Sequence, residues 1–430
     1  MNTSYLKNLK PPIAIIGLGK SGLSALKLLN AAGFSSDQIV TFDDKNPSAQ
    51  IQDPAKLRER RPQTLVVSPG FSLKTDWIQQ MVQEGVFLTS EIGLGASVLS
   101  TEKVIGITGS VGKSTVTSLL GFGMKAFDSH SFAGGNLGTP LCDYALRVLQ
   151  GEPRATWVAL ELSSYQLENC GPLKLDYSII TFLSANHLER YNDLTEYYMT
   201  KMRITEITRT LCVINKTSAD AVHYASKAQC PYRLVHADNS SRQDLMPRLF
   251  LIGSHNKDNF AVAAEIAIAA NWPEKALLEM THYRGLSHRM EFVANINQVT
   301  YVNDSKATAM DSVLVATKGC LENISPSNKL YLLLGGRDKN LPWQDLAVLS
   351  THENINCVFF GACGELARDK SGLHGEYFTK LGSAINFCQK RAHAGDVVLL
   401  SPGGTSLDEF KSFEERGDFF KTLVLSEIEA

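Results

Sequence analysis

The sequence predicts an α/β protein of three domains, and three observations support this prediction. Short apolar, β-branched runs alternate with helix-length amphipathic segments from one end of the chain to the other. Such runs are typical of parallel strands that helices cover on both faces. The chain has 430 residues, which is too long for one ordinary core. Glycine-rich turns follow three of the runs, near residues 17, 109 and 335, and suggest one turn for each α/β unit.

The expected strands are spaced so that a helix fits between most of them. In chain order they are 13–17, 38–42, 64–68, 103–108, 157–162, 177–182, 211–215, 299–304, 330–336 and 396–401. Boundaries near residues 94 and 286 place one glycine-rich turn in each unit. We therefore expect domains over 1–94, 95–285 and 286–430, with boundaries defined to within several residues.

Composition and charge narrow the class of protein. Hydrophobic residues make up 44% of the chain, charged residues 20%, and the formal net charge is −2, which does not favour nucleic acid or anionic lipid as a partner. The first residues, MNTSYLKNLKPP, lack the apolar core of a signal peptide. No apolar stretch reaches the roughly 20 residues that span a bilayer. The eight cysteines form no C-x-x-C pair. We expect a cytoplasmic enzyme with reduced thiols and no membrane insertion.

The first glycine-rich turn is Gly17-Leu18-Gly19-Lys20-Ser21-Gly22, between an apolar run and a helical pattern. Glycines let the backbone turn tightly and approach a pyrophosphate at a helix N-terminus. Asp43 follows at the end of the next run, about where a ribose-binding acid would lie. The pattern is typical of an NAD site or of another nucleotide-diphosphate site, and by itself it does not separate the two.

The second turn runs from Gly109 to Thr115 and reads Gly-Ser-Val-Gly-Lys-Ser-Thr. In a P-loop, backbone N–H groups cradle phosphates, a lysine (here Lys113) reaches the β- and γ-oxygens, and a hydroxyl (here Ser114) ligates Mg²⁺. Ile107 stands where the strict pattern has glycine, but Gly-Lys-Ser-Thr between a strand and a helix is specific. A dehydrogenase needs no P-loop, so this turn indicates ATP chemistry.

Three further side chains have ordinary interpretations when each is taken alone. Glu161 lies at the end of the run 157–162 and could hold Mg²⁺ as a Walker-B acid does, although many strands end in Glu. His187 fits a solvated loop histidine. Lys201 lies in a helical pattern and fits a lysine on a helix surface.

Taken together, these motifs resemble the Mur ligases of bacterial peptidoglycan synthesis over the whole chain. The shared motifs, in order, are T-G-x-x-G-K-S-T (108–115), G-G-N-x-G (134–138), E-L-S-S (161–164), N-H (186–187), K-M-R (201–203), H-N (255–256), H-R (288–289), N-D-S-K-A-T (303–308), L-L-G-G (333–336) with Lys339, and S-L-D-E-F-K (406–411). The chain is most similar to the family member that adds D-glutamate to UDP-N-acetylmuramoyl-L-alanine through an acyl-phosphate. It lacks the D-N-P-R motif of the diamino-acid-adding member.

The resemblance implies a Rossmann-like N-terminal domain, a central P-loop mononucleotide-binding domain and a Rossmann-like C-terminal domain. It implies that ATP is bound by Gly109, Ser110, Val111, Gly112, Lys113, Ser114, Thr115, Asn256, Asn259, Arg289, Asp304 and Lys306. The UDP part of the acceptor would be held by Gly17, Leu18, Gly19, Lys20, Ser21, Gly22, Asp43 and Asn136. D-Glutamate would be held by Thr308, Lys339, Ser406, Leu407 and Phe413.

The resemblance also implies the catalytic set. Lys113, Glu161, His187 and Lys201 would be catalytic. Two Mg²⁺ ions would be held by Ser114, Glu161, His187 and Lys201, the last as a carbamate. On this interpretation the first glycine-rich turn takes UDP instead of NAD, and Lys201 is not a surface lysine.

Departures from the family pattern, at Val111, Asn186, Ala309 and 403–405, and two alternative functions remain at this point. Val111 replaces the usual Asn of the loop, and Asn186 precedes His187 where many members carry Asp. A folylpolyglutamate-synthase-type ligase would use the same chemistry on another acceptor, and a P-loop regulator would bind nucleotide without ligation. We expect a monomer whose partners are UDP-N-acetylmuramoyl-L-alanine and D-glutamate, and which binds no nucleic acid.

Overall fold

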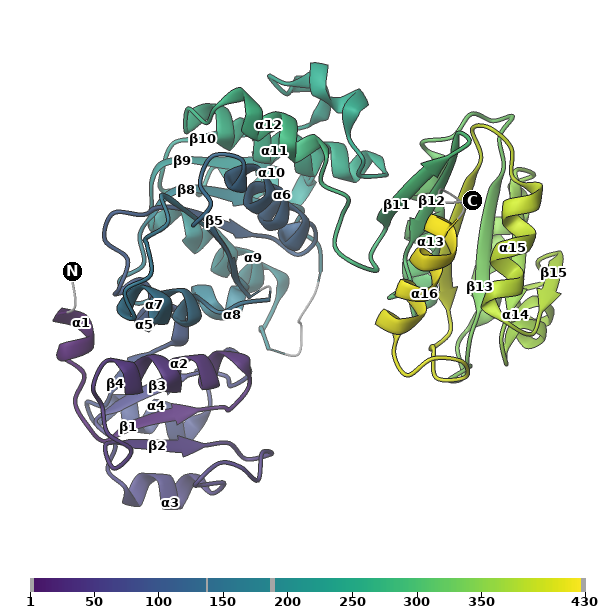
Figure 1. Ribbon diagram of the computed structural model, residues 1–430. Coiled ribbons are helices and arrows are strands. Elements are labelled where there is room, and N and C mark those ends of the chain that lie inside the picture. Colours follow the sequence, from purple (N-terminus) through teal and green to yellow (C-terminus); the bar gives the residue numbers. More distant parts are fainter. Residues whose placement is uncertain (1–3, 137, 186–189, 427–430) are drawn as a thin grey trace. The chain divides into compact units, whose positions relative to one another are not determined.

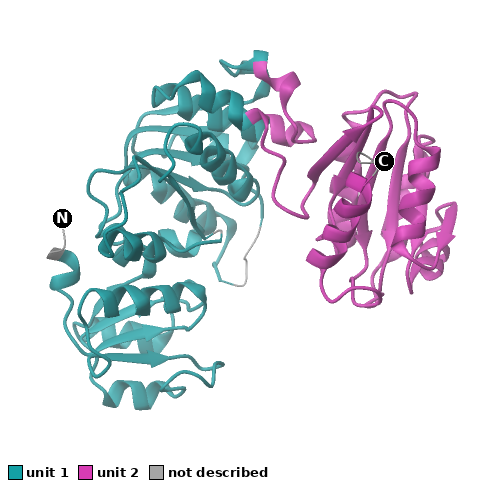
Figure 2. Cartoon of the chain, viewed as in Figure 1, with its two compact units in different colours: residues 1–244, 258–280 teal, residues 245–257, 281–430 magenta. Residues whose placement is uncertain are grey.

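The computed structural model describes residues 4–136, 138–185 and 190–426. It divides into two compact units, residues 1–244 with 258–280 and residues 245–257 with 281–430 (Figure 2). Within the described residues the strands form three sheets, one of four strands and two of six (Figure 1). The predicted α/β class with parallel sheets in three regions is therefore confirmed.

The first unit begins with a parallel sheet of order β2-β1-β3-β4. Its strands are β1 (Ile13–Ile16), β2 (Ile39–Phe42), β3 (Thr64–Val67) and β4 (Phe87–Thr89). The helices of this region are α1 (Ser4–Lys7), α2 (Lys20–Ala31), α3 (Pro54–Glu59), α4 (Asp76–Gln83) and α5 (Glu91–Ala96). Successive residues of β1 enter different cores, because side chains alternate along a strand. Ile15 packs in one cluster with Leu28 of α2, and Ile16 packs in another with Leu57 of α3.

The first unit continues with a second parallel sheet, of order β10-β9-β8-β5-β7-β6. Its strands are β5 (Lys103–Thr108), β6 (Phe132–Gly135), β7 (Trp157–Glu161), β8 (Leu175–Ile180), β9 (Thr208–Asn215) and β10 (Tyr232–Val235). Its helices include α6 (Lys113–Lys125), α7 (Leu141–Leu149), α8 (Ser164–Leu167), α9 (Leu194–Met202), α10 (Ala219–Ala225) and α12 (Glu274–Thr281); the boundary between the units falls within α11 (Ser254–Ala269). The strand order reverses beside β5, and ligands of open α/β sheets bind at such switch points.

The two sheets of the first unit share one hydrophobic core. Helices α2 and α5 pack against α7, and one buried cluster runs from Ile13 of β1 to Ile214 of β9. A hydrogen bond of 2.7 Å from Ser24 Oγ to Asp143 Oδ1 joins α2 to α7. The N-terminal sheet is thus fixed to the central sheet by packing.

The second unit contains a sheet of order β11-β12-β16-β13-β14-β15, in which β11 runs antiparallel to β12 and the other pairs are parallel. Its strands are β11 (Glu291–Ile296), β12 (Val299–Asn303), β13 (Leu330–Gly335), β14 (Ile355–Phe360), β15 (Gly375–Phe378) and β16 (Val397–Gly403). Helix α13 (Met310–Leu321), helix α14 (Gly364–Ser371) and the 3-10 segment Trp343–Thr351 pack in one buried cluster with Leu332. Helices α15 (Leu381–Arg391) and α16 (Phe413–Ser426) pack in the other with Leu333.

Two further observations bear on the chemistry. No helix in the described part of the chain is both long and apolar enough to cross a membrane. All eight cysteines are free thiols, six of them buried and two half-buried.

Candidate active site

The second glycine-rich turn connects β5 to α6 and needs its glycines. Gly109 and Gly112 have φ angles of 148° and 90°, which side-chain-bearing residues rarely adopt. A Cβ atom on Gly109 would lie 1.9 Å from Thr181 Oγ1. The backbone N–H groups of Ser110 and Val111 donate to Phe182 O at 2.8 and 3.2 Å. The loop is therefore held against the carboxyl end of the neighbouring strand β8, and Val111 itself is 59% exposed.

Lys113 begins helix α6 and folds back over this loop. Its Nζ donates to Gly109 O at 2.9 Å and to Ser110 O at 3.1 Å. Burial lowers the pKa of Lys113, and the nearby charge of Glu161 raises it. The ammonium group thus lies at the mouth of the loop, where phosphate oxygens bind in a P-loop.

Glu161 ends β7 and is 2% exposed. Its Oε2 accepts a hydrogen bond of 2.7 Å from Ser114 Oγ, and its Oε1 accepts one of 2.7 Å from Asn136 Nδ2. A carboxylate and a hydroxyl side by side are hard oxygen donors of the kind that Mg²⁺ prefers, and Mg²⁺ normally takes its remaining ligands from water and phosphate. Accordingly, the described residues contain no group of three or more His, Cys, Asp or Glu arranged to hold a metal ion by themselves.

Lys201 lies on α9 and is only 2% exposed, so it is not a lysine of the helix surface. Its Nζ donates to Gly109 O at 2.8 Å and lies 4.6 Å from the centroid of the Tyr197 ring. Burial, together with the positive charge of Lys113, lowers the pKa of Lys201 to about 7, although Glu161 raises it. A substantial fraction of the amine is neutral at neutral pH, which makes it a nucleophile. Asn186 and His187 lie outside the described residues.

The carboxylate of Asp43 links the first glycine-rich turn to the residues that follow β2. The Oδ2 atom of Asp43 accepts from Leu18 N at 2.8 Å, and Oδ1 accepts from Lys45 N and Asn46 N at 3.0 Å each. The bond from Leu18 is the main cause of the lowered pKa of Asp43. A Cβ atom on Gly22 would lie 1.8 Å from Gly17 O, so only glycine fits there. Gly19 caps α2, and Lys20, Ser21 and Gly22 form the first turn of that helix.

In the second unit four of the predicted glutamate-binding residues lie on loops that follow β12, β13 and β16, and the fifth, Phe413, is the first residue of α16. The last two loops pair, because Arg337 and Thr405 exchange backbone hydrogen bonds of 2.8 and 2.9 Å. The carboxylate of Asp338 accepts from Asn340 N and Leu341 N at 3.1 and 3.2 Å and so shapes the loop that carries Lys339. Of the predicted glutamate-binding residues, only Ser406 is buried. The others are exposed or half-buried, namely Thr308, Lys339, Leu407 and Phe413.

The predicted ATP-binding residues divide between the units. In the first unit Asn259 lies close to the second glycine-rich turn, because a Cβ atom on Gly112 would lie 2.6 Å from Asn259 Oδ1. In the second, Asp304 Oδ2 accepts from Ser401 Oγ at 2.9 Å, and burial raises the pKa of Asp304 to about 7. Asn256 Nδ2 donates to Ile252 O at 2.7 Å, and Arg289 is exposed. Lys306 Nζ lies 5.1 Å from the Phe413 ring centroid, so a predicted ATP residue and a predicted glutamate residue contact each other.

Known proteins similar to this chain agree with the geometry. The Mur ligase middle domain matches residues 107–273. Among curated proteins, the chain is 34% identical to the UDP-N-acetylmuramoylalanine–D-glutamate ligase of Pasteurella multocida and 33% identical to that of Haemophilus influenzae, over 99% of both chains in each case. It is 30% identical to that of Koribacter versatilis, over 96% of both chains. The chain belongs to the Mur ligase family.

Solved structures show the same fold at lower identity. A UDP-N-acetylmuramoyl-L-alanyl-D-glutamate–2,6-diaminopimelate ligase matches with a TM-score of 0.58 and 18% identity, over 99% of this chain and 94% of that one. A UDP-N-acetylmuramoylalanyl-D-glutamyl-2,6-diaminopimelate–D-alanyl-D-alanyl ligase of Acinetobacter baumannii matches with a TM-score of 0.56 and 15% identity, over 94% and 98% of the chains. The three-domain fold and the resemblance to Mur ligases that the motifs predicted are confirmed.

Sequence reasoning did not single out several residues that shape the sites of this Mur ligase. Thr181 donates to Val111 O at 2.6 Å, and Tyr197 OH lies 3.2 Å from Ser110 Oγ. Arg416 is fully buried and donates to Ser305 O and Gly404 O at 2.8 and 3.1 Å. Thr181 had a signal, since a polar residue at the end of the expected strand 177–182 lies at the binding edge of a parallel sheet.

Proposed function

We propose that this Mur ligase is an ATP-dependent enzyme that joins D-glutamate to UDP-N-acetylmuramoyl-L-alanine through an acyl-phosphate, a step of peptidoglycan precursor synthesis. The observation that carries the proposal is the convergence of Lys113, Glu161 and Lys201 on the segment 109–115. That constellation supports phosphoryl transfer. The choice of acceptor and amino acid is supported by similarity over almost the whole chain to D-glutamate ligases.

The chain's own residues are suited to stabilise charge during the transfer. With ATP and Mg²⁺ bound, the acceptor carboxylate would take the γ-phosphoryl group and release ADP. The neutral amine of D-glutamate would then displace phosphate from the acyl carbon and lose a proton as the amide forms. Lys113 is positioned to neutralise the transferring oxygens. Ser114 and Glu161 are oxygen donors for Mg²⁺, and the bond from Asn136 holds the Glu161 carboxylate in place.

We propose in addition that Lys201 is carbamylated and that two Mg²⁺ ions are bound. The neutral amine adds CO₂ to give a carbamate and a proton, R–NH₂ + CO₂ → R–NH–COO⁻ + H⁺. The reaction needs a neutral amine, which the lowered pKa of Lys201 supplies. The product is an anion beside the Lys113 ammonium, which would attract it, whereas the protonated amine would be repelled. A carbamate has two oxygens and can ligate a metal ion; His187 completes the proposed ligand set.

The turn at Gly17–Gly22 is proposed to bind the diphosphate of the UDP group. It follows β1 and begins α2, so its N–H groups and the helix N-terminus favour an anion. We propose that Asp43 acts here mainly by fixing the turn, because both of its oxygens already accept backbone N–H groups. Asn136 is proposed to contact the acceptor near Glu161.

D-Glutamate is proposed to bind at the loops that follow β12, β13 and β16. Lys339 would supply a cation for the side-chain carboxylate, and the hydroxyls of Thr308 and Ser406 would donate directed hydrogen bonds. Leu407 and Phe413 would cover the apolar part. An unpaired carboxylate in such a site would carry a large desolvation cost, so the cation is expected to dominate affinity.

We further propose a cytoplasmic monomer with domains over 1–94, 95–285 and 286–430. The net charge of −2 gives the chain no general attraction for nucleic acid.

The proposed function is tested by ADP release and product mass. Purified protein is mixed with ATP, Mg²⁺ and UDP-N-acetylmuramoyl-L-alanine, with D-glutamate, L-glutamate or no amino acid added. We expect continuous ADP release and a product one glutamyl residue heavier only with D-glutamate. If a parallel mixture with a folate in place of UDP-N-acetylmuramoyl-L-alanine gives the glutamylated product and this one does not, the folylpolyglutamate-type alternative is favoured. Nucleotide binding without any ligation would favour a P-loop regulator.

A further inference from the structure

The turn formed by residues 68–71, which we call the 68–71 turn, lies against the first glycine-rich turn. It follows β3 directly and is closed by a hydrogen bond of 3.0 Å from Phe71 N to Ser68 O. Ser68 Oγ donates to Gly17 O at 2.9 Å in a buried contact. A Cβ atom on Gly17 would lie only 3.0 Å from both Phe71 Cε2 and Ser68 Cβ. The position of Gly17 therefore depends on the position of the 68–71 turn.

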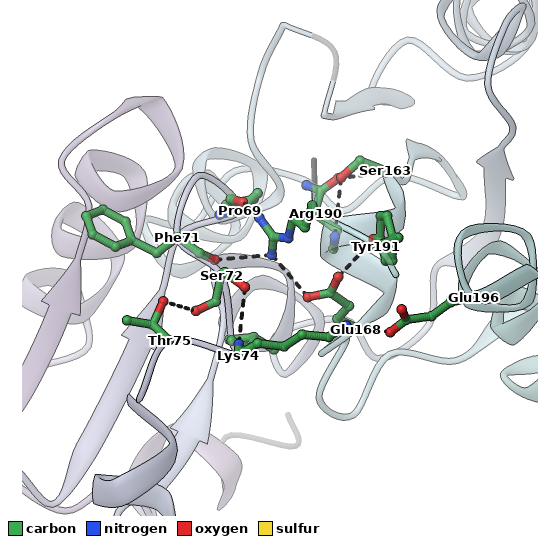
Figure 3. Close-up of polar contacts among 12 residues, drawn as sticks. Pro69, Phe71, Ser72, Lys74, Thr75, Ser163, Glu168, Arg190, Tyr191 and Glu196 are labelled. Carbon is green, nitrogen blue, oxygen red and sulfur yellow. Dashed lines mark hydrogen bonds and ion pairs between the residues drawn. The ribbon is translucent and has the colours of Figure 1, made fainter. Parts of the chain in front are cut away.

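A side chain from the central region holds this turn (Figure 3). Arg190 Nη1 donates to Pro69 O at 2.7 Å, and Arg190 Nη2 donates to Phe71 O at 3.2 Å. A planar guanidinium with several fixed donors is suited to grip two carbonyl groups at once, which a lysine cannot do.

Arg190 is itself fixed by residues on and beside α8. Its Nη2 pairs with Glu168 Oε2 at 3.0 Å, and the two side chains are only 11% and 17% exposed. Its Cζ lies 3.9 Å from the centroid of the Tyr165 ring. Tyr191 OH donates to Glu168 Oε1 at 2.8 Å. Helix α8 begins three residues after Glu161, the last residue of β7, so Arg190 ties the glycine-rich turn to the strand end that carries Glu161.

A second ion pair crosses between the same regions and serves as a comparison. Lys74 Nζ lies 2.6 Å from Glu196 Oε1, but the side chains are 53% and 33% exposed. Exposed ion pairs contribute little to stability, because water screens the charges and both side chains lose conformational entropy. The buried, multiply bonded Arg190 is thus the specific connection, and Lys74 provides a matched control.

We propose that Arg190 is a positioning residue for the UDP-linked acceptor. Through the 68–71 turn it holds the glycine-rich turn beside α8 and the carboxyl end of β7, so that a bound acceptor presents its carboxylate to the loop of Lys113. This inference rests on the proposed binding of UDP at Gly17–Gly22. Without Arg190 the turn samples other conformations, and apparent affinity falls with the fraction of molecules in the competent one.

The test compares Michaelis constants for the three substrates in Arg190→Lys, Arg190→Met and Glu168→Gln, with Lys74→Ala as control. Arg190→Lys should raise KM for UDP-N-acetylmuramoyl-L-alanine about tenfold while KM for ATP and for D-glutamate stays within about twofold. Glu168→Gln should change the same constant in the same direction by a smaller factor, and Lys74→Ala should change none. An acceptor KM unchanged in both Arg190→Lys and Glu168→Gln contradicts the proposal. So does an equal rise in all three constants, which would mark a general structural role.

Thermal shift with UDP separates this inference from the assignment on which it rests. If UDP does not stabilise the wild-type protein, the UDP site at the glycine-rich turn is wrong, whatever Arg190 does. If UDP stabilises the wild type and Arg190→Lys to the same extent, and the acceptor KM is also unchanged, the UDP site stands and the role of Arg190 is refuted. Arg190→Lys keeps the positive charge; if Arg190→Met does not fold, Arg190→Lys and Glu168→Gln still decide the question.

Discussion

Lys113 is the only cationic side chain in the segment 109–115. Its amino group donates hydrogen bonds to the carbonyl groups of Gly109 and Ser110. Removing a group that stabilises transition-state charge typically slows an enzyme by about 100-fold or more. Lys113→Ala should therefore lower phosphate release at least about 100-fold. Lys125→Ala, an exposed lysine at the other end of the same helix, should keep full activity. Near-normal turnover in Lys113→Ala would rule out the P-loop assignment.

Lys201 should control activity through a CO₂ adduct. Lys201→Ala should be nearly inactive and should recover part of its activity with acetate, which supplies a small carboxylate in place of the carbamate. Depleting CO₂ should slow the wild-type enzyme, and bicarbonate should restore it. Full activity of Lys201→Ala in CO₂-free buffer would refute the carbamate proposal.

The lowered pKa of Lys201 also predicts how stability changes with pH. Between pH 7 and the ordinary lysine range the unfolded chain binds a proton that the folded protein has released. In CO₂-free buffer this group should therefore make the free energy of unfolding rise with pH above 7, by up to about 1.4 kcal/mol per pH unit. Lys201→Met should lack this contribution, whereas Lys227→Met, at an exposed position, should retain it. Denaturant unfolding between pH 7 and 9 measures the difference, and equal slopes in both variants would contradict it.

The role of a residue could be predicted where a reactive side chain directly follows an expected strand. It was predicted less well where burial of the side chain depends on packing against residues distant in the sequence. Glu161 and Lys113 were recognisable from the strand and turn beside them. The helical pattern around Lys201 indicates a surface position, because the pattern does not show that α9 turns this side chain toward Gly109. Arg190 and Arg416 are charged residues whose default position is the surface, and only the fold shows the carbonyls that they bind.

At the scale of single elements, the glycine-rich turn after β1 allows a paired test. A Cβ atom on Gly22 would collide with Gly17 O, whereas one on Gly19 meets no atom within 4 Å. Gly22→Ala should therefore destabilise the folded protein. Gly19→Ala should fold normally but lose affinity for UDP, because a methyl group would face the diphosphate. Thermal melts with UDP and with NAD distinguish the two effects. Protection by NAD and not by UDP would reverse the assignment of this turn.

The loop after β13 should select the amino acid. Asp338 orders this loop and Lys339 is exposed on it. Lys339→Ala should raise KM for D-glutamate by about tenfold or more, which corresponds to the loss of one charge-assisted bond. KM for ATP should not change, and Lys380→Ala, also exposed, is the control. A glutamate KM that is unchanged in Lys339→Ala would place specificity elsewhere.

Several strands were predictable because their residues are continuously apolar, but β14, which reads INCVFF, was missed. The runs at 103–108 and 330–336 correspond to β5 and β13, which are buried almost throughout. Strand β6 reads FAGG and β15 reads GEYF, and neither has an apolar run. Both are edge strands, with one neighbour each, so their pairing depends on the adjacent strand more than on their own side chains.

In the molecule as a whole, acceptor, ATP and amino acid must react in one sequence of steps. The acyl-phosphate route has a direct signature. The oxygen that leaves the acceptor carboxylate must appear in the released phosphate, because the carboxylate attacks phosphorus and the amine later displaces phosphate from carbon.

The acyl-phosphate route is therefore best tested with UDP-N-acetylmuramoyl-L-alanine labelled with ¹⁸O in its carboxylate. In the presence of ATP, Mg²⁺ and D-glutamate, mass spectrometry should find one labelled oxygen in each phosphate formed, together with one equivalent of amide product. Unlabelled phosphate, or phosphate released without amide product, would show that the enzyme hydrolyses ATP by another route.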